Sequence, residues 1–122
     1  MISIVAKVVH GKALGRTMGF ATANQDTSEI KECPEYGVYA SEVWVDSNKY
    51  IGVTNVGTRP TIDNESKITI ETHILDFNED IYDKVIRVDL CHYLRGISKF
   101  ASKEELIAQV QKDEQHAKEL LG

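Results

Sequence analysis

The sequence lacks a long apolar run, has few cysteines and shows no excess of basic side chains. None of its apolar stretches approaches the ~20 residues of a transmembrane helix. Its first residues lack the charged start, apolar stretch and cleavage site of a signal peptide. Two cysteines, Cys33 and Cys91, are too few for a disulfide framework and have no partners at metal-ligand spacing. These absences predict a cytoplasmic protein with reduced thiols and no membrane partner.

The distribution of charge argues against a nucleic-acid partner. Residues 1–61 carry six basic and six acidic side chains, whereas residues 62–122 carry eight basic and thirteen acidic ones, which gives the whole net charge of -5. A nucleic-acid-binding protein normally presents a basic stripe, and no such stripe is visible. We therefore expect any bound polyanion to be small and to lie near the neutral half.

The 122 residues support one hydrophobic core, so a single domain over residues 1–122 is expected. Five segments alternate between apolar and polar residues, as half-buried strands do. Their connections are of hairpin length, which favours an antiparallel sheet or closed barrel over a parallel sheet. One connection contains the turn-forming residues Asp46, Ser47 and Asn48. The five predicted strands are 2–9, 37–45, 50–56, 67–77 and 85–94.

One helix is predicted at the C-terminus. Ser102 and Glu105 form a capping box, in which the serine hydroxyl accepts from the Glu105 amide and the glutamate reaches back to the Ser102 amide. An apolar stripe follows and is interrupted at Asp113; its members are Leu106, Val110, Ala117 and Leu121. A small antiparallel barrel with a C-terminal helix packed against it is the predicted architecture.

Two long segments, 10–36 and 57–66, show no regular periodicity, and loops of this length in a compact domain are usually functional. The first has glycines at positions 11, 15 and 19 together with Lys12 and Arg16. Its spacing matches neither the phosphate loop of common NTPases nor a dinucleotide fingerprint. On spacing alone, an ordinary turn-rich connection is the better interpretation and phosphate binding the alternative.

Three polar residues suggest chemistry without establishing it. Thr22 and Asn24 lie two apart, so an extended chain points both oxygens the same way, as a Mg²⁺ site would require. Taken alone, turn residues that bond their own backbone are the better interpretation. Glu71 lies mid-strand on the parity opposite Ile68, Ile70 and Ile74, and His73 shares its side. Pattern alone favours a solvated face for Glu71 over a general base.

Five sequence blocks stand in a characteristic order along the chain. The first, Gly15–Asn24, reads Gly-Arg-x-x-Gly-Phe-Ala-Thr-Ala-Asn, and the last joins Leu94, Arg95 and Phe100 to the C-terminal helix. The three between them are 37–40, 55–61 and 70–77, the last followed by Asp80-Ile81-Tyr82. In this order and spacing the blocks resemble the riboflavin kinase (flavokinase) family over nearly the whole chain.

The resemblance implies a mainly β fold, a six-stranded antiparallel Greek-key barrel with a C-terminal α-helix. It also implies transfer of the γ-phosphoryl group of ATP to the 5′-hydroxyl of riboflavin, which yields FMN and ADP. The implied metal is Mg²⁺, with Mn²⁺ and Zn²⁺ left open, and the protein is expected to act as a monomer. The chain is too short for the adenylyltransferase of bacterial relatives and lacks a His-x-Gly-His motif, so FAD synthesis is expected to be absent.

The resemblance assigns roles by position. Glu71 falls on the catalytic base, and Thr22 and Asn24 fall on the Mg²⁺-binding pair. The positions implied to contact the nucleotide are Gly11, Arg16, Thr22, Asn24, Ile74, Asp76 and Tyr82. The positions implied to bind the flavin are Arg95, Ser98 and Phe100.

The sequence departs from the family pattern at three places. Ala21 replaces a proline, Asp83 replaces a common glycine, and Gly96-Ile97-Ser98 replaces Pro-Glu-Lys. The last change affects the flavin side, so a non-catalytic flavin-binding or regulatory module on the same barrel is the main alternative. A structural barrel without a ligand is a third alternative, and it predicts no stabilisation by FMN or ADP.

Overall fold

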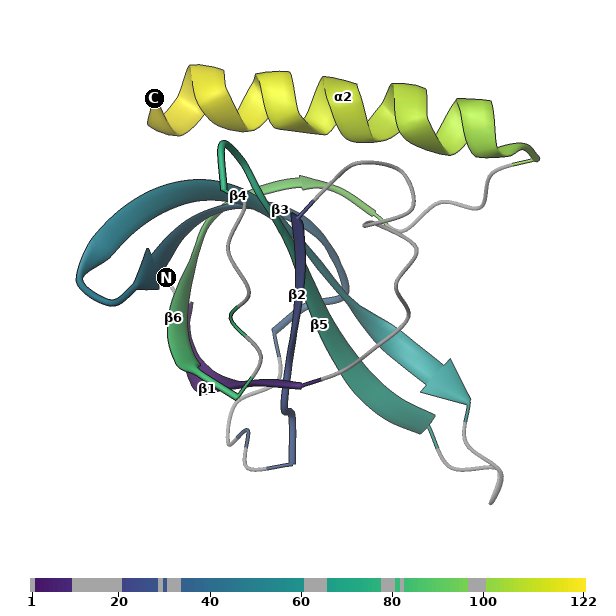
Figure 1. Cartoon of the computed structure of the whole chain (residues 1–122). Coiled ribbons are helices and arrows are strands. Elements are labelled where there is room, and N and C mark those ends of the chain that lie inside the picture. The colour runs from purple at the N-terminus through teal and green to yellow at the C-terminus, as the bar shows by residue number, and fades with distance from the viewer. Residues whose placement is uncertain are drawn as a thin grey trace.

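The computed structural model is a closed antiparallel β-barrel with a C-terminal helix packed on its outside (Figure 1). The structure describes residues 2–9, 21–28, 30, 34–60, 66–77, 81, 83–96 and 101–122, without the side chains of residues 21, 22, 58–60, 66 and 67. The elements are β1 (Ile2–Val9), β2 (Ala21–Gln25), β3 (Gly37–Val45), β4 (Asn48–Pro60), β5 (Ser66–Ile74), β6 (Val85–Arg95) and α2 (Lys103–Leu121). Around the barrel the strand order is β1-β2-β5-β4-β3-β6. The predicted mainly β fold, a six-stranded antiparallel barrel with a C-terminal helix, is confirmed.

Five of the six strands were predicted from alternation. The bounds of β1 and β3 are as predicted, β4 extends beyond 50–56 at both ends, and β6 runs one residue further than expected. The predicted run 67–77 is too long, because β5 ends at Ile74 and a turn with Asp76 in a left-handed conformation (φ 54°) follows. Alternation missed β2, which lies inside the segment 10–36.

The β3–β4 hairpin closes through a tight turn at Asp46 and Ser47, as the turn residues predicted. Both residues have positive φ, 48° and 73°. Two successive left-handed residues form the type I′ turn, whose twist matches that of antiparallel strands. The turn fixes a register in which Val45 lies opposite Asn48 and Gly37 opposite Val56.

Alternation on β5 separates the barrel interior from its outer face. Ile70, Thr72 and Ile74 are buried inside, with exposed fractions of 1%, 0% and 4%. The interior also holds a chain of hydroxyls, in which Thr54 Oγ1 bonds Ser41 Oγ at 2.8 Å and Thr72 Oγ1 at 2.9 Å. Each hydroxyl thus has a partner, as buried polar groups require. Glu71 and His73 consequently point to the outer face.

Helix α2 covers part of that outer face. Ala117 packs against a small apolar cluster on β3 and β4, formed by Val38, Ala40 and Val53. The helix begins after Ser102, whose Oγ accepts from the Glu105 amide at 3.2 Å. The sequence predicted that the Glu105 carboxylate accepts from the Ser102 amide. In the structure it accepts instead from the amide of Ala101, at 2.9 Å. Among the described residues, no helix is long and apolar enough to cross a bilayer.

Candidate active site

Three polar side chains form a row across neighbouring strands on the outer face of the barrel. Glu71 on β5 lies directly opposite Asn24 on β2 and directly opposite Asn55 on β4. All three residues are partly buried. Residues directly opposite each other in a sheet share a face and have Cβ atoms roughly 5 Å apart. The fold therefore flanks one carboxylate with a side-chain amide on either side.

Of the predicted metal pair, Asn24 is the member whose side chain the structure describes. Thr22 lies on β2 opposite His73, and its side chain is outside the described residues. An amide oxygen beside a carboxylate suits a hard cation such as Mg²⁺, which commonly takes few protein ligands and fills its remaining positions with water and phosphate oxygens. Within the described ranges, no group of three or more His, Cys, Asp or Glu side chains is placed to hold a metal.

The Glu71 carboxylate is more basic than an exposed one. Its side chain keeps 32% of its exposure, and burial raises the pKa of the carboxyl above its usual value of 4.5. Burial has this effect because a charged carboxylate loses hydration when water is excluded. A raised pKa makes Glu71 a stronger proton acceptor for a neighbouring hydroxyl.

His73 lies beside Glu71 on the same strand face and beneath α2. Its Nε2 is 3.8 Å from Glu71 Oε1, and its side chain is 7% exposed. Burial lowers the pKa of His73, and the nearby Asp113 carboxylate partly opposes this shift. Burial therefore favours the neutral form of the imidazole, which lies beside the Glu71 carboxylate.

Arg95 and Asp113 form a bidentate ion pair between the end of β6 and α2. Arg95 Nη2 donates to Asp113 Oδ2 at 2.7 Å, and Nε donates to Oδ1 at 3.1 Å. Gln109 Nε2 donates to the same carboxylate at 3.1 Å, and Arg95 Nη1 donates to the carbonyl of Gly96 at 3.1 Å. Asp113 interrupts the apolar stripe of the helix in the sequence. In the structure its buried carboxylate is satisfied by these hydrogen bonds, which attach the helix to β6.

The two positions after Glu71 that the resemblance assigns to the nucleotide, Ile74 and Asp76, differ in their surroundings. The Ile74 side chain is 4% exposed and packs in the barrel core, so a nucleotide would meet its backbone. Asp76 is exposed in the turn after β5. Burial is the main cause that raises the pKa of Glu114 on α2; Lys118 opposes the shift, and Asp76 and Asp113 add to it. Asp76 thus lies near the helix.

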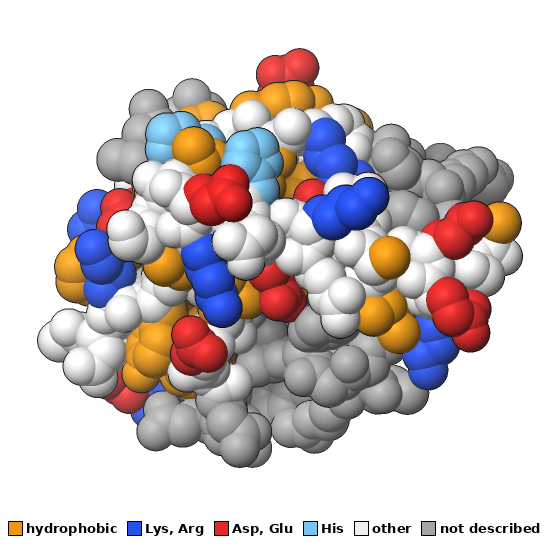
Figure 2. Space-filling view, turned by 90° about the horizontal axis from the view of Figure 1, so that it is seen from above, with side chains coloured by type: hydrophobic (Ala, Val, Ile, Leu, Met, Phe, Trp, Pro, Cys, Tyr) orange, Lys and Arg blue, Asp and Glu red, His pale blue; other side chains and the backbone are white. Residues whose placement is uncertain are grey.

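Several predicted positions lie outside the described residues, namely Gly11, Arg16, Tyr82, Ser98 and Phe100. Their assignments stay predictions. Figure 2, seen from the side that carries α2, shows acidic and basic side chains interspersed over this face. Cys91 forms no disulfide, and Cys33 is outside the described residues.

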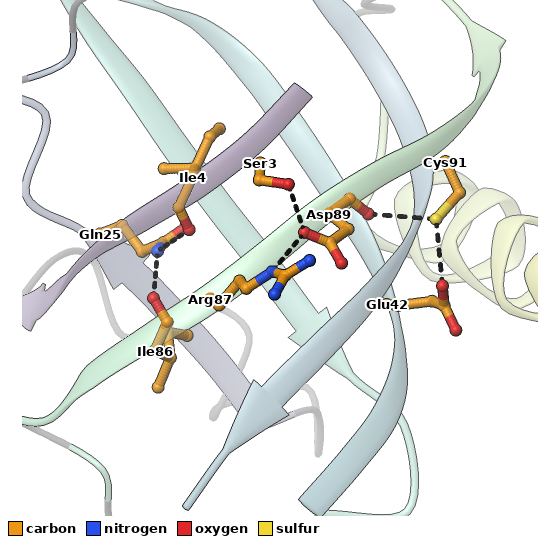
Figure 3. A network of polar contacts seen from close by, with 8 residues as sticks. All are labelled: Ser3, Ile4, Gln25, Glu42, Ile86, Arg87, Asp89 and Cys91. Atoms are coloured by element: carbon orange, nitrogen blue, oxygen red, sulfur yellow. Dashed lines mark hydrogen bonds and ion pairs between the residues drawn. The ribbon is translucent and has the colours of Figure 1, made fainter. Parts of the chain in front are cut away.

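A second polar network lies on the opposite side of the barrel, on β1, β6 and β3 (Figure 3). Asp89, 3% exposed, accepts from Ser3 Oγ at 2.6 Å and from Arg87 Nε at 2.9 Å. Burial alone would raise the pKa of Asp89, and the hydrogen bonds from Arg87 and Ser3 hold it below its usual value. Cys91 Sγ donates to Glu42 Oε1 at 3.6 Å. These contacts link β6 to β1 and β3, and Figure 3 also shows Gln25 Nε2 of β2 donating to the carbonyls of Ile4 and Ile86, both at 3.2 Å.

Two residues of the site were not predicted. Asn55 belongs to a recognised block, but its position beside Glu71 depends on the β4–β5 register, which alternation does not reveal. Asp113 did leave a signal, because a carboxylate on the apolar side of a helix needs a partner.

Fold and site together define the class: a small closed barrel with a C-terminal helix packed on its outside, and a carboxylate on its outer face between two side-chain amides. Residues 1–121 match the family model described as riboflavin kinase. The chain belongs to the riboflavin kinase (flavokinase) family.

Similar proteins agree with this family. The chain is 43% identical over 121 residues to the bifunctional riboflavin kinase/FMN adenylyltransferase of Escherichia coli, a match that covers 98% of the chain and 38% of that relative. The chain thus spans well under half the length of the curated relative.

Two crystal structures share the fold. The riboflavin kinase of Trypanosoma brucei superposes with a TM-score of 0.69 at 23% identity, covering 98% of this chain and 78% of that one. A protein of Streptococcus pneumoniae named a macrolide-efflux protein superposes with a TM-score of 0.88 at 34% identity, covering 95% of this chain and 38% of that one. Because that name describes transport whereas the family match is to a kinase, this likeness supports the fold alone.

Proposed function

We propose that residues 1–122 act as one riboflavin kinase domain that transfers the γ-phosphoryl group of ATP to the ribityl 5′-hydroxyl of riboflavin, giving FMN and ADP. The observation that carries the proposal is the register of the barrel. It sets the predicted base, Glu71, directly opposite the predicted metal ligand, Asn24. The family match over residues 1–121 is the reason for proposing riboflavin and ATP as the substrates.

The chemistry suits this arrangement. Phosphoryl transfer needs little covalent help from a protein and depends on alignment and on neutralising charge over the phosphate oxygens. A bound Mg²⁺ ion would supply that neutralising charge, and Thr22 and Asn24 would hold it with neutral oxygens. Glu71, made more basic by burial, would orient the acceptor hydroxyl and take its proton.

The remaining assignments complete the proposed site. The glycine-rich segment with Gly11 and Arg16 would face the phosphates, and Ile74, Asp76 and Tyr82 would meet the nucleotide. Arg95, Ser98 and Phe100 would bind the flavin. The ion pair with Asp113 holds the Arg95 guanidinium against α2, so a flavin would meet an arginine of fixed orientation.

The proposal is tested by incubating the protein with riboflavin, ATP and Mg²⁺ and resolving the flavins and nucleotides by chromatography. FMN and ADP are expected in equal amounts, and a chelator is expected to stop their formation. Repeating the assay with Mn²⁺ and Zn²⁺ identifies the preferred metal. Riboflavin binding without any FMN would support the non-catalytic flavin-binding module instead.

A further inference from the structure

His73 lies beside the predicted base and has no role in the proposed chemistry. It follows Glu71 by two positions on β5, so both side chains leave the same face of the sheet. Its Nε2 lies 3.8 Å from Glu71 Oε1. That separation is longer than a hydrogen bond, and catalytic hydrogen bonds are often long before substrates bind. A small rotation of either side chain would bring the two groups into contact.

The other surroundings of His73 limit its motion. The residue is 5% exposed, and the cluster that joins its neighbour Val53 to α2 lies beside it. The Asp113 carboxylate on α2 is near enough to influence the imidazole. Asp113 is itself fixed by three hydrogen bonds from the Arg95 guanidinium and one from Gln109. Burial beside this cluster therefore holds the imidazole next to the carboxylate of the predicted base.

We infer that His73 is a positioning residue, which holds the Glu71 carboxylate in the orientation that accepts the proton of the riboflavin 5′-hydroxyl. The inference rests on the proposed kinase activity. Loss of His73 would leave Glu71 free to take several rotamers, of which few suit the reaction.

The test compares two substitutions at His73 in steady-state assays of FMN formation. His73→Leu keeps an apolar side chain under the helix and removes the N–H, so kcat should fall by roughly 10–100-fold with a change in the KM for riboflavin below about threefold. His73→Gln places an amide N–H near the position of Nε2, so most of the lost kcat should return. Equal kcat in the wild type and His73→Leu would overturn the inference.

A double-mutant cycle separates positioning from mere support of the fold. If His73 acts through Glu71, His73→Leu should cost little once Glu71→Gln is present, because effects of residues that act as a unit are not additive. Additive losses would overturn the inference. Val53→Ala is the matched control, since Val53 lies opposite His73 and packs in the same cluster. It should lower stability and leave kcat unchanged.

Two further outcomes are decisive. If His73→Leu does not fold, His73→Asn serves in the cycle, because its shorter amide keeps a polar group but stops short of Glu71; unchanged kcat in that variant counts against the inference. If the wild type itself forms no FMN, the proposed function fails and the inference fails with it. An active wild type with an equally active His73 variant refutes the inference alone.

Discussion

The Glu71 carboxylate is subject to two opposing demands. The proposed role as a base needs it ionised, whereas burial disfavours the charge and raises its pKa. A folded-state pKa above the unfolded value of 4.5 means that ionising this group costs stability. Functional groups are commonly maintained at such a cost to the fold.

Replacing Glu71 by glutamine should therefore stabilise the protein at neutral pH. A pKa that is higher in the folded than in the unfolded state means that the folded protein holds the Glu71 proton more tightly. The resulting contribution to the free energy of unfolding is complete below about pH 4.5 and is lost as the pH rises through the raised pKa of the folded state. Glutamine does not ionise. Urea unfolding across pH should show an advantage of Glu71→Gln that is constant in acid and grows toward pH 7.

Glu35→Gln, at an exposed position, is the control and should show no such trend. A Glu71→Gln variant that is less stable than the wild type at pH 7 would contradict this account of burial.

Residue types at the site were predictable from the sequence, but their contacts were not. Glu71 was placed on the correct face by alternation along β5, and Asn24 was recognised by its block. That Glu71 lies opposite Asn24 and Asn55 depends on the pairing of β5 with β2 and β4. The partners of Asp113 could not be predicted either, because Arg95 meets it only after α2 has docked on the barrel.

At the scale of elements, the sequence of α2 determines where the helix begins, and contacts with the barrel determine where it packs. Ser102 caps the first turn, and the Arg95–Asp113 pair and the cluster around Ala117 hold the helix against β3 and β4. Burying an ion pair is seldom stabilising compared with apolar packing, but it fixes orientation. The helix is thus located by a polar contact as well as by apolar ones.

The N-cap offers a direct test at this scale. Ser102→Ala removes the acceptor for the Glu105 amide and should lower the free energy of unfolding by about 1 kcal/mol. Lys112→Ala, at an exposed position of the same helix, is the matched change and should stay within about 0.5 kcal/mol of the wild type. Urea unfolding followed by circular dichroism measures both, and equal stabilities would show that the cap contributes nothing.

Strand prediction failed where an element is short and depends on its partners. β2 has five residues, and its central Ala23 and terminal Gln25 are buried because β1 and β5 enclose them. Its sequence, Ala-Thr-Ala-Asn-Gln, has few of the β-branched and aromatic residues that mark strands. Tertiary pairing therefore decides the conformation of this segment. The longer strands β1, β3 and β6 were predictable because their alternation persists over many residues.

At the scale of the molecule, closure of the barrel joins residues that are far apart in the chain. Pairing of β2 with β5 brings Asn24 to Glu71, and the docking of α2 brings Asp113 to Arg95. The site draws on β2, β4, β5, β6 and α2, so it exists only in the folded chain. Ligands that bind it should therefore stabilise the whole fold.

Thermal unfolding in the presence of products tests this linkage. FMN, ADP and Mg²⁺ at about 100 times their dissociation constants should each stabilise the protein by up to about 2.7 kcal/mol through mass action. Inorganic phosphate at the same ionic strength controls for salt. A melting temperature independent of the FMN and ADP concentrations would favour the ligand-free structural barrel.

The central claim, that Glu71 is the base of a riboflavin kinase, is tested most directly by measuring FMN formation in the wild type and Glu71→Gln side by side, with Glu35→Gln as control. The account predicts that kcat falls by roughly 10²–10⁴-fold in Glu71→Gln while the KM values for ATP and riboflavin change little. Wild-type kcat in the Glu71→Gln protein would contradict it.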